Sequence, residues 1–180
     1  MALNKNADLE SRVKGSYDSG ELDNFLDRAN RKMHGRVGKH VKHDEVASDT
    51  GQTVFDVPVE QLLEVTRVEY QGETLESNEY SVDLDAGEVT LTSDFDGSVD
   101  RGEVLRIYFK PTLFKDLEME YAVKFAWKQR YRNTGNDTAK ASVEDADDMI
   151  QTYVSDILSL NSSMTSFDHS GAGRPTGRGV

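Results

Sequence analysis

Two short stretches hold the residue types that bind metal ions. Residues 40–45 (HVKHDE) place two histidines three positions apart with two acids directly after them, and imidazole and carboxylate groups are common metal ligands. This stretch has no sustained hydrophobic period and no third anchor, so we expect a solvated polar loop rather than a metal site. Residues 94–103 (DFDGSVDRGE) resemble a calcium loop only in their first two acids, and the closing Glu is not in its place, which favours a surface turn.

Motifs for enzymatic chemistry are absent from the sequence. The chain contains no G-x-S-x-G elbow, no P-loop and no G-x-G-x-x-G fingerprint, and carboxylate pairs are too common in so acidic a chain to indicate acid–base catalysis. Trp127 and Tyr131 lie among Lys and Arg residues and would suit base stacking, but packing in the core or at an interface is favoured. We therefore expect a protein that is not an enzyme, with no cofactor and no metal ion.

The charge of the chain is strongly negative and unevenly placed. The formal net charge is −12, and residues 44–109 hold 17 Asp and Glu against 3 Lys and Arg. A nucleic-acid-binding domain should be basic, so this balance argues against one. Two explanations stay open: adaptation to high salt, where screening weakens self-repulsion, or an acidic face that repels DNA phosphates.

The absence of cysteine and the hydropathy of the chain restrict its possible metal sites and its cellular location. The chain has no cysteine, which excludes disulfides, thiolate zinc sites and iron–sulfur clusters. No stretch approaches the roughly 18 apolar residues of a membrane span. Charges interrupt the N-terminal run MALNKNADLESR, where a signal peptide needs apolar residues. We expect a soluble protein that is made in the cytoplasm and has no membrane partner.

Apolar residues at three- and four-residue steps predict three main helices, over residues 20–34, 113–132 and 143–160. Ser19 is expected to cap the first helix and Gly35 to end it, and Ser142 is expected to begin the last. Residues 5–17 are expected to form a shorter helix or an arm. These segments predict a small helical bundle.

Between the first two main helices the pattern changes to the two-residue period of strands with one wet face. Residues 36–51 have no sustained period and are expected to be a connection. Residues 52–109 predict an antiparallel meander of about five strands, with a hairpin over residues 80–91 and Pro111 just after the last strand. The predicted fold class is α+β: a small helical bundle with an inserted antiparallel β-meander and an extended C-terminal tail.

Four parts follow one another along the chain. The N-terminal arm and first helix of the helical domain occupy residues 1–51, the acidic β-subdomain residues 52–110, the last two helices of the helical domain residues 111–160, and a Gly/Ser/Arg tail residues 161–180. The tail has no core-forming pattern, so we expect it to be extended.

The helix over residues 113–132 carries two apolar stripes. One stripe contains Phe114, Leu117, Tyr121, Phe125 and Ala126, and the other contains Val123, Trp127 and Tyr131. A helix of a small isolated protein usually needs only one such stripe. The second stripe indicates either a neighbouring molecule or burial within the chain's own fold, and both alternatives stay open. The candidate interface residues are Val123, Trp127, Tyr131, Phe167, Arg174 and Arg178.

The order of these parts resembles a known family. A first helix (ELDNFLDRANRKMHGRVG) is followed by a β-insertion (VTRVEYQGETLESNEYSVDLDAGEVTL), a Tyr-containing strand (RIYF), a long helix (LEMEYAVKFAWKQRYRNTGN) and a last amphipathic helix. Over roughly residues 20–160 this is similar to the head–tail adaptor, or connector, proteins of tailed viruses. The β-insertion and the acidity depart from the shortest members of that family and fit a tailed virus of a salt-loving, haloarchaeal host.

The resemblance implies a structural role in the virion. Family members form a ring of about twelve copies bound to the portal protein, extend the DNA channel and offer a platform for the next neck protein. Viral DNA would pass without specific binding, because an acidic lining offers no phosphate-neutralising contacts. We expect the tail, residues 161–180, to bind the portal or a neighbouring subunit, in a protein assembled in the host cytoplasm and located in the virion neck.

Two alternatives remain beside the adaptor. One is another neck or tail-completion protein, such as a stopper or tail terminator, but those are more β-dominated than this chain. The other is a halophilic soluble binding module that uses the acidic β-region as its binding face. Such a module should be monomeric and should not need the second apolar stripe.

Overall fold

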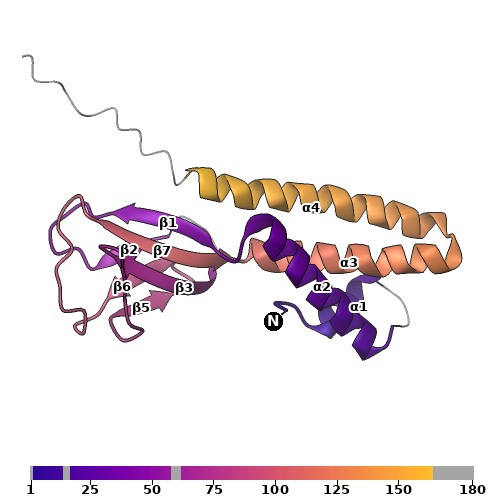
Figure 1. Ribbon diagram of the computed structural model, residues 1–180, viewed down its shortest axis with the longest axis horizontal. Coiled ribbons are helices and arrows are strands. Elements are labelled where there is room, and N and C mark those ends of the chain that lie inside the picture. Colours follow the sequence, from indigo (N-terminus) through magenta and orange to yellow (C-terminus); the bar gives the residue numbers. More distant parts are fainter. Residues whose placement is uncertain (1, 14–16, 58–61, 164–180) are drawn as a thin grey trace, which may run out of the picture.

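Helices form one end of the molecule and strands form the other (Figure 1). The computed structural model describes residues 2–13, 17–57 and 62–163. The helices are α1 (Asn6–Val13), α2 (Ser19–Val37), α3 (Leu113–Thr134) and α4 (Asp137–Ser163), and the strands are β1 (Val41–Val46), β2 (Val54–Asp56), β3 (Leu62–Tyr70), β4 (Glu73–Thr74), β5 (Tyr80–Asp83), β6 (Glu88–Leu91) and β7 (Val104–Pro111). The α+β class is confirmed, and the described residues form four helices where three main ones were predicted.

Helix α2 begins and ends at residues other than those predicted. Asp18, rather than the serine after it, caps the helix: its carboxylate accepts a hydrogen bond from the N–H of Glu21 at 2.8 Å, and the Glu21 carboxylate accepts one from the N–H of Asp18 at 3.2 Å. Gly35 does not end the helix, which continues to Val37 and ends at Gly38, where φ is 86°. Burial of Val37 offsets the roughly 1 kcal/mol that a helical glycine costs.

Residues that were expected to be a connection form β1, which pairs antiparallel with β7. Val41 and His43 of β1 are buried, and Lys42 between them is partly exposed. The outer face of this strand is charged, so its alternating pattern is short and hard to recognise in the sequence. The β-region therefore begins at Val41 rather than at residue 52.

The strands form two sheets rather than one meander. One sheet has the order β1-β7-β3-β4 and the other β2-β6-β5, which makes seven described strands where about five were predicted. The last strand, β7, lies between β1 and β3, whereas a meander places each strand beside the next one along the chain. The predicted hairpin is confirmed, with Tyr80 of β5 opposite Leu91 of β6 and Asp83 opposite Glu88.

A short connection joins α3 to α4. Gly135, with φ 65°, ends α3, and the side chain of Asn136 accepts a hydrogen bond from the N–H of Thr138 at 2.8 Å, which caps the start of α4. Helix α4 therefore begins at Asp137 rather than at residue 143, where the predicted helix starts. Ser142 lies inside the helix and its hydroxyl donates to the carbonyl of Thr138 at 3.0 Å, so it does not begin the helix as predicted.

The hydrophobic core is one cluster that extends from the helices into the sheets. Helix α3 packs against α1, α2 and α4, and α4 also contacts β1. Leu9 and Val13 of α1 are fully buried, so α1 belongs to the helical bundle. The predicted tail falls outside the described residues except for residues 161–163, which end α4. Within the described part of the chain, no helix combines the length and the apolarity needed to span a lipid bilayer.

Candidate assembly surface

A buried carboxylate in the N-terminal half of α3 holds neighbouring segments against this helix. Glu118 is fully buried, and a carboxylate is costly to remove from water unless it is paired or hydrogen-bonded. Its Oε2 accepts hydrogen bonds from the N–H groups of Leu3 and Asn4 at 2.8 and 2.7 Å and from the Asn4 side-chain amide at 2.9 Å. Its Oε1 accepts one from the side-chain amide of Asn30 at 2.7 Å. These bonds fix both the N-terminal segment and α2 on α3.

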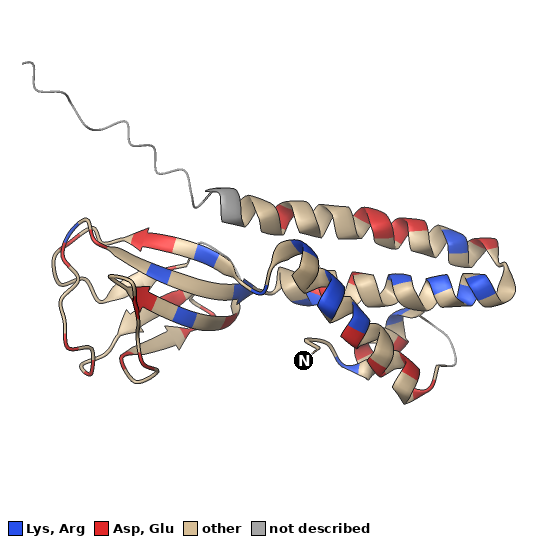
Figure 2. Cartoon of the chain, in the orientation of Figure 1, with Lys and Arg blue, Asp and Glu red and all other residues tan. Residues whose placement is uncertain are grey.

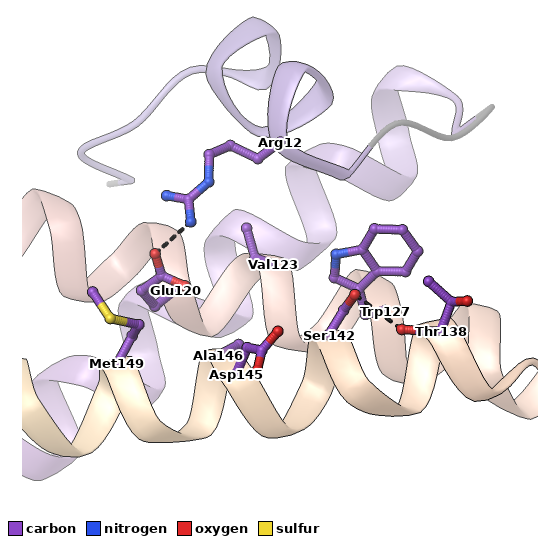
Figure 3. A pocket seen from close by; sticks show the side chains of 9 residues that line it. All are labelled: Arg12, Glu120, Val123, Trp127, Thr138, Ser142, Asp145, Ala146 and Met149. Carbon is purple, nitrogen blue, oxygen red and sulfur yellow. Dashed lines mark hydrogen bonds and ion pairs between the residues drawn. The ribbon is translucent and has the colours of Figure 1, made fainter.

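A second buried carboxylate joins α1 to α3. The side chain of Glu120 is 5% exposed, and Arg12 of α1 places Nη2 2.6 Å from its Oε1 (Figure 3). The side chain of Arg12 is itself 48% exposed, so solvent screens part of this attraction. The ion pair stands at the border of a groove.

This groove lies between α3 and α4 and has a volume of about 410 Å³ (Figure 3). Val123 and Ala146 are buried, whereas Met149 is 41% exposed and Trp127 is partly buried. The remaining lining residues are polar or charged: Arg12, Glu120, Thr138, Ser142 and Asp145. An apolar strip bordered by polar groups suits an apolar side chain from another protein.

The second apolar stripe of α3 changes character along its length. Val123 is 6% exposed and lies in the core, on the side of α3 that faces α4. Trp127 is partly exposed, and the Arg130 guanidinium lies 5.1 Å from the centre of its ring. Tyr131 is 38% exposed. The stripe is thus covered by the chain itself at its first position and open at its last.

The six candidate interface residues divide into two sets. Val123, Trp127 and Tyr131 lie on α3 as described above, and an interface role for them stays a prediction. Phe167, Arg174 and Arg178 lie outside the described residues.

A second hollow, between α2 and α3, is cationic. It has a volume of about 340 Å³ and is lined by Arg28, Phe125, Lys128, Gln129, Arg132 and Asn133, so the described residues that line it include no carboxylate. The Arg28 guanidinium lies 4.5 Å from the centre of the Phe125 ring, a cation–π contact. Lys128 and Arg132 are exposed. We call this hollow the basic pocket; its residues come from two helices, so spacing along the sequence does not reveal it.

The histidine-containing stretch lies on and beside β1. His43 Nε2 is 2.9 Å from Glu45 Oε2, and the His40 ring meets the Tyr108 ring edge-on, with 5.0 Å between ring centres. Burial, followed by the charges of Arg67 and two lysines, lowers the pKa of His40. The described residues contain no group of three or more His, Asp or Glu side chains arranged to hold a metal ion.

Comparison with known proteins gave a structural likeness but no sequence family. No protein-family model matches the chain, and no curated protein matches it. The chain is similar to part of a solved structure described as "Neck of empty GTA particle computed with C6 symmetry". The two chains are 14% identical, the match covers 64% of this chain and 76% of that one, and the TM-score is 0.28.

Proposed function

We propose that this chain is a head–tail adaptor of a tailed virus with a haloarchaeal host, a structural protein of the virion neck. About twelve copies form a ring under the portal protein, extend the DNA channel and dock the next neck protein. The chain performs no catalysis in this role, and its partners are its own copies, the portal, the next neck or tail protein and the DNA that passes through.

The observation that carries this proposal is the open C-terminal end of α3. Trp127 is partly exposed and Tyr131 is 38% exposed, and both lie in the last two turns of α3, at the end of the helix pair that lies far from the strands (Figure 1). Met149 of α4, which is 41% exposed, lines the same groove as Trp127. Exposed apolar side chains along one groove and the helix end beside it indicate a contact surface. In a ring, the same contact repeats from copy to copy and covers this surface in each.

The acidic β-region supports the same role. Residues 44–109 hold 17 Asp and Glu against 3 Lys and Arg, and DNA binding requires cations that neutralise phosphates. A channel beside such a region would let DNA slide. The order of helices and β-insertion, which resembles that of head–tail adaptors, supports the proposal independently of charge.

The test is the mass of the full chain in molar salt, with and without the portal protein of the same virus, measured by light scattering and by electron microscopy. A ring, alone or on the portal, is expected. A chain that stays monomeric and ignores the portal would instead support a soluble binding module.

Matched variants locate the surface. Tyr131→Ser should leave the melting temperature nearly unchanged and weaken ring formation, whereas Leu158→Ser, at an α4 residue that is 46% exposed and far from the groove, should leave the ring intact. Val123→Asn should instead unfold the monomer, because Val123 is buried in the chain's own core. Normal rings of Tyr131→Ser would remove this surface from the proposal.

A further inference from the structure

The β5–β6 turn presents an apolar side chain among carboxylates. Leu84 is 41% exposed and stands in the sequence Asp83-Leu84-Asp85-Ala86-Gly87-Glu88. None of its three acids makes an ion pair with a Lys or Arg of the described residues. We call residues 83–88 the acidic tip.

The acidic tip is held in one shape. The Asp83 carboxylate accepts hydrogen bonds from the N–H groups of Asp85 and Ala86 at 3.0 and 2.9 Å, and the N–H of Gly87 donates to the Asp83 carbonyl at 2.9 Å. The Gly87 carbonyl in turn accepts a bond from the N–H of Val57 at 2.7 Å, which ties the tip to the strand beside it. A turn that is ordered before it binds loses less conformational entropy on binding.

The basic pocket has the complementary chemistry. It combines a partly buried apolar ring, Phe125, with the cations Arg28, Lys128 and Arg132. Lys128 and Arg132 make no ion pair with an acid of the described residues. The tip thus pairs a leucine with acids, and the pocket pairs an aromatic ring with bases.

One chain cannot bring the two together. The β5–β6 hairpin lies at the strand end of the molecule, and the C-terminal half of α3 lies at the opposite end (Figure 1). Figure 2 shows the same separation of charge, with Lys and Arg along the C-terminal part of α3 and Asp and Glu in the loops of the β-region. A contact between the tip of one copy and the pocket of the next joins unlike surfaces, and such contacts generate rings when the rotation closes.

We propose that the acidic tip of one copy binds in the basic pocket of the next, with Leu84 packed against Phe125 and with Asp85 and Glu88 paired with Lys128 and Arg132. This inference rests on the proposed ring and names a further contact between its neighbouring copies. The net charge of −12 favours a protein partner over DNA, and Leu84 supplies the apolar contact that a phosphate lacks.

The absence of cysteine from the chain permits a direct test, because introduced cysteines are then the only thiols. Leu84→Cys and Lys128→Cys are prepared as separate full-length proteins, mixed under assembly conditions and mildly oxidised. A disulfide-linked dimer is expected from the mixture and from neither protein alone. Leu84→Cys mixed with Ser155→Cys, at an exposed residue of α4, is the matched control. Equal linking in both mixtures, or none, overturns the contact.

Charge reversal tests the same contact without introduced cysteines or oxidation. Lys128→Glu with Arg132→Glu should weaken association by about tenfold or more, because like charges then face each other. Asp85→Lys with Glu88→Lys in the mixing partner should restore it. If the wild-type chain forms rings on the portal but the two cysteine variants do not cross-link, this contact is overturned and the adaptor role stands. A chain that never assembles removes both proposals. Binding of a DNA oligonucleotide that Lys128→Glu abolishes would assign the pocket to phosphate and also overturn the contact.

Discussion

In the helical region two glutamates of α3 are buried, whereas the carboxylates of the β-region lie mostly at its surface. Glu118 and Glu120 are both buried, and each contacts groups from distant parts of the sequence. In the β-region, Asp44 pairs with Arg106 on the neighbouring strand and remains partly exposed. The three carboxylates of the acidic tip make no ion pair with a Lys or Arg of the described residues; Asp83 and Asp85 are exposed and Glu88 is partly exposed.

This difference in burial distinguishes two roles of carboxylate side chains in one protein. A buried carboxylate specifies which segments dock, because any other arrangement leaves it without hydrogen bonds in a place where water cannot supply them. An exposed carboxylate adds little to stability but sets the charge that a partner meets. Changes to the first kind should therefore act on folding, and changes to the second kind on assembly.

The largest expected effect follows from removing Glu118. Glu118→Ala removes the acceptor of the buried N–H of Asn4, of the buried side-chain amide of Asn30 and of the partly buried N–H of Leu3. We expect a loss of about 3–5 kcal/mol in the free energy of unfolding, as when one partner of a buried charged network is removed. Urea unfolding followed by circular dichroism measures it. Glu144→Ala, at an exposed residue of α4, is the control and should stay within about 0.5 kcal/mol.

An intermediate effect is expected for Arg12. Arg12→Ala leaves Glu120 buried without its cation. The Arg12 side chain is 48% exposed, so water already screens the ion pair, and we expect the free energy of unfolding to fall by about 1–2 kcal/mol. In the Arg12→Ala, Glu120→Gln double variant, the loss should be smaller than the sum of the two single losses, because the two residues share one interaction. Additive losses in urea unfolding would show that the pair contributes nothing to stability.

The sequence predicts the helices from their apolar spacing and the hairpin from its alternation, because both signals are local. It does not predict β1, whose partner β7 lies far along the chain and whose outer face is charged. The start of α4 is also missed, because its cap is the short pair Gly135-Asn136 and its first turn carries little apolar pattern.

The candidate assembly surface on α3 is likewise only partly predictable from the sequence. The two stripes of α3 can be recognised from spacing, but whether α4 or a neighbour covers Val123 depends on how the helices pack. Glu118 had a visible signal, since it follows Phe114 by one helical turn on the apolar face. Its hydrogen-bond donors come from residues remote in sequence, so only the folded chain identifies them. The basic pocket likewise requires α2 and α3 to lie side by side.

The smallest effect in this comparison should come from Asp44, a carboxylate paired at the sheet surface. Its Oδ1 accepts a hydrogen bond from Arg106 Nε at 2.7 Å, and its Oδ2 lies 3.1 Å from Lys42 Nζ. Burial is the largest single influence and would raise the pKa of Asp44, but the hydrogen bonds and charges of Arg106 and Lys42 together outweigh it and lower the pKa. Asp44 thus loses its proton more readily in the folded chain than in the unfolded one.

A lowered pKa stabilises the fold above the pKa of the unfolded carboxyl, about 4, and this stability is lost as the pH falls through the lower folded pKa. At pH 7, Asp44→Asn should therefore reduce the free energy of unfolding by less than about 1 kcal/mol, the range of partly exposed pairs. The difference from wild type should shrink as the pH is lowered through the folded pKa, since the protonated wild-type group no longer attracts Arg106. Asp96→Asn, at an exposed acid of a loop, serves as the control and should differ from wild type at neither pH. A loss for Asp44→Asn that persists unchanged into acid would mean that Asp44 acts through packing and geometry, and the contrast between buried and surface carboxylates would then rest on burial alone rather than on charge.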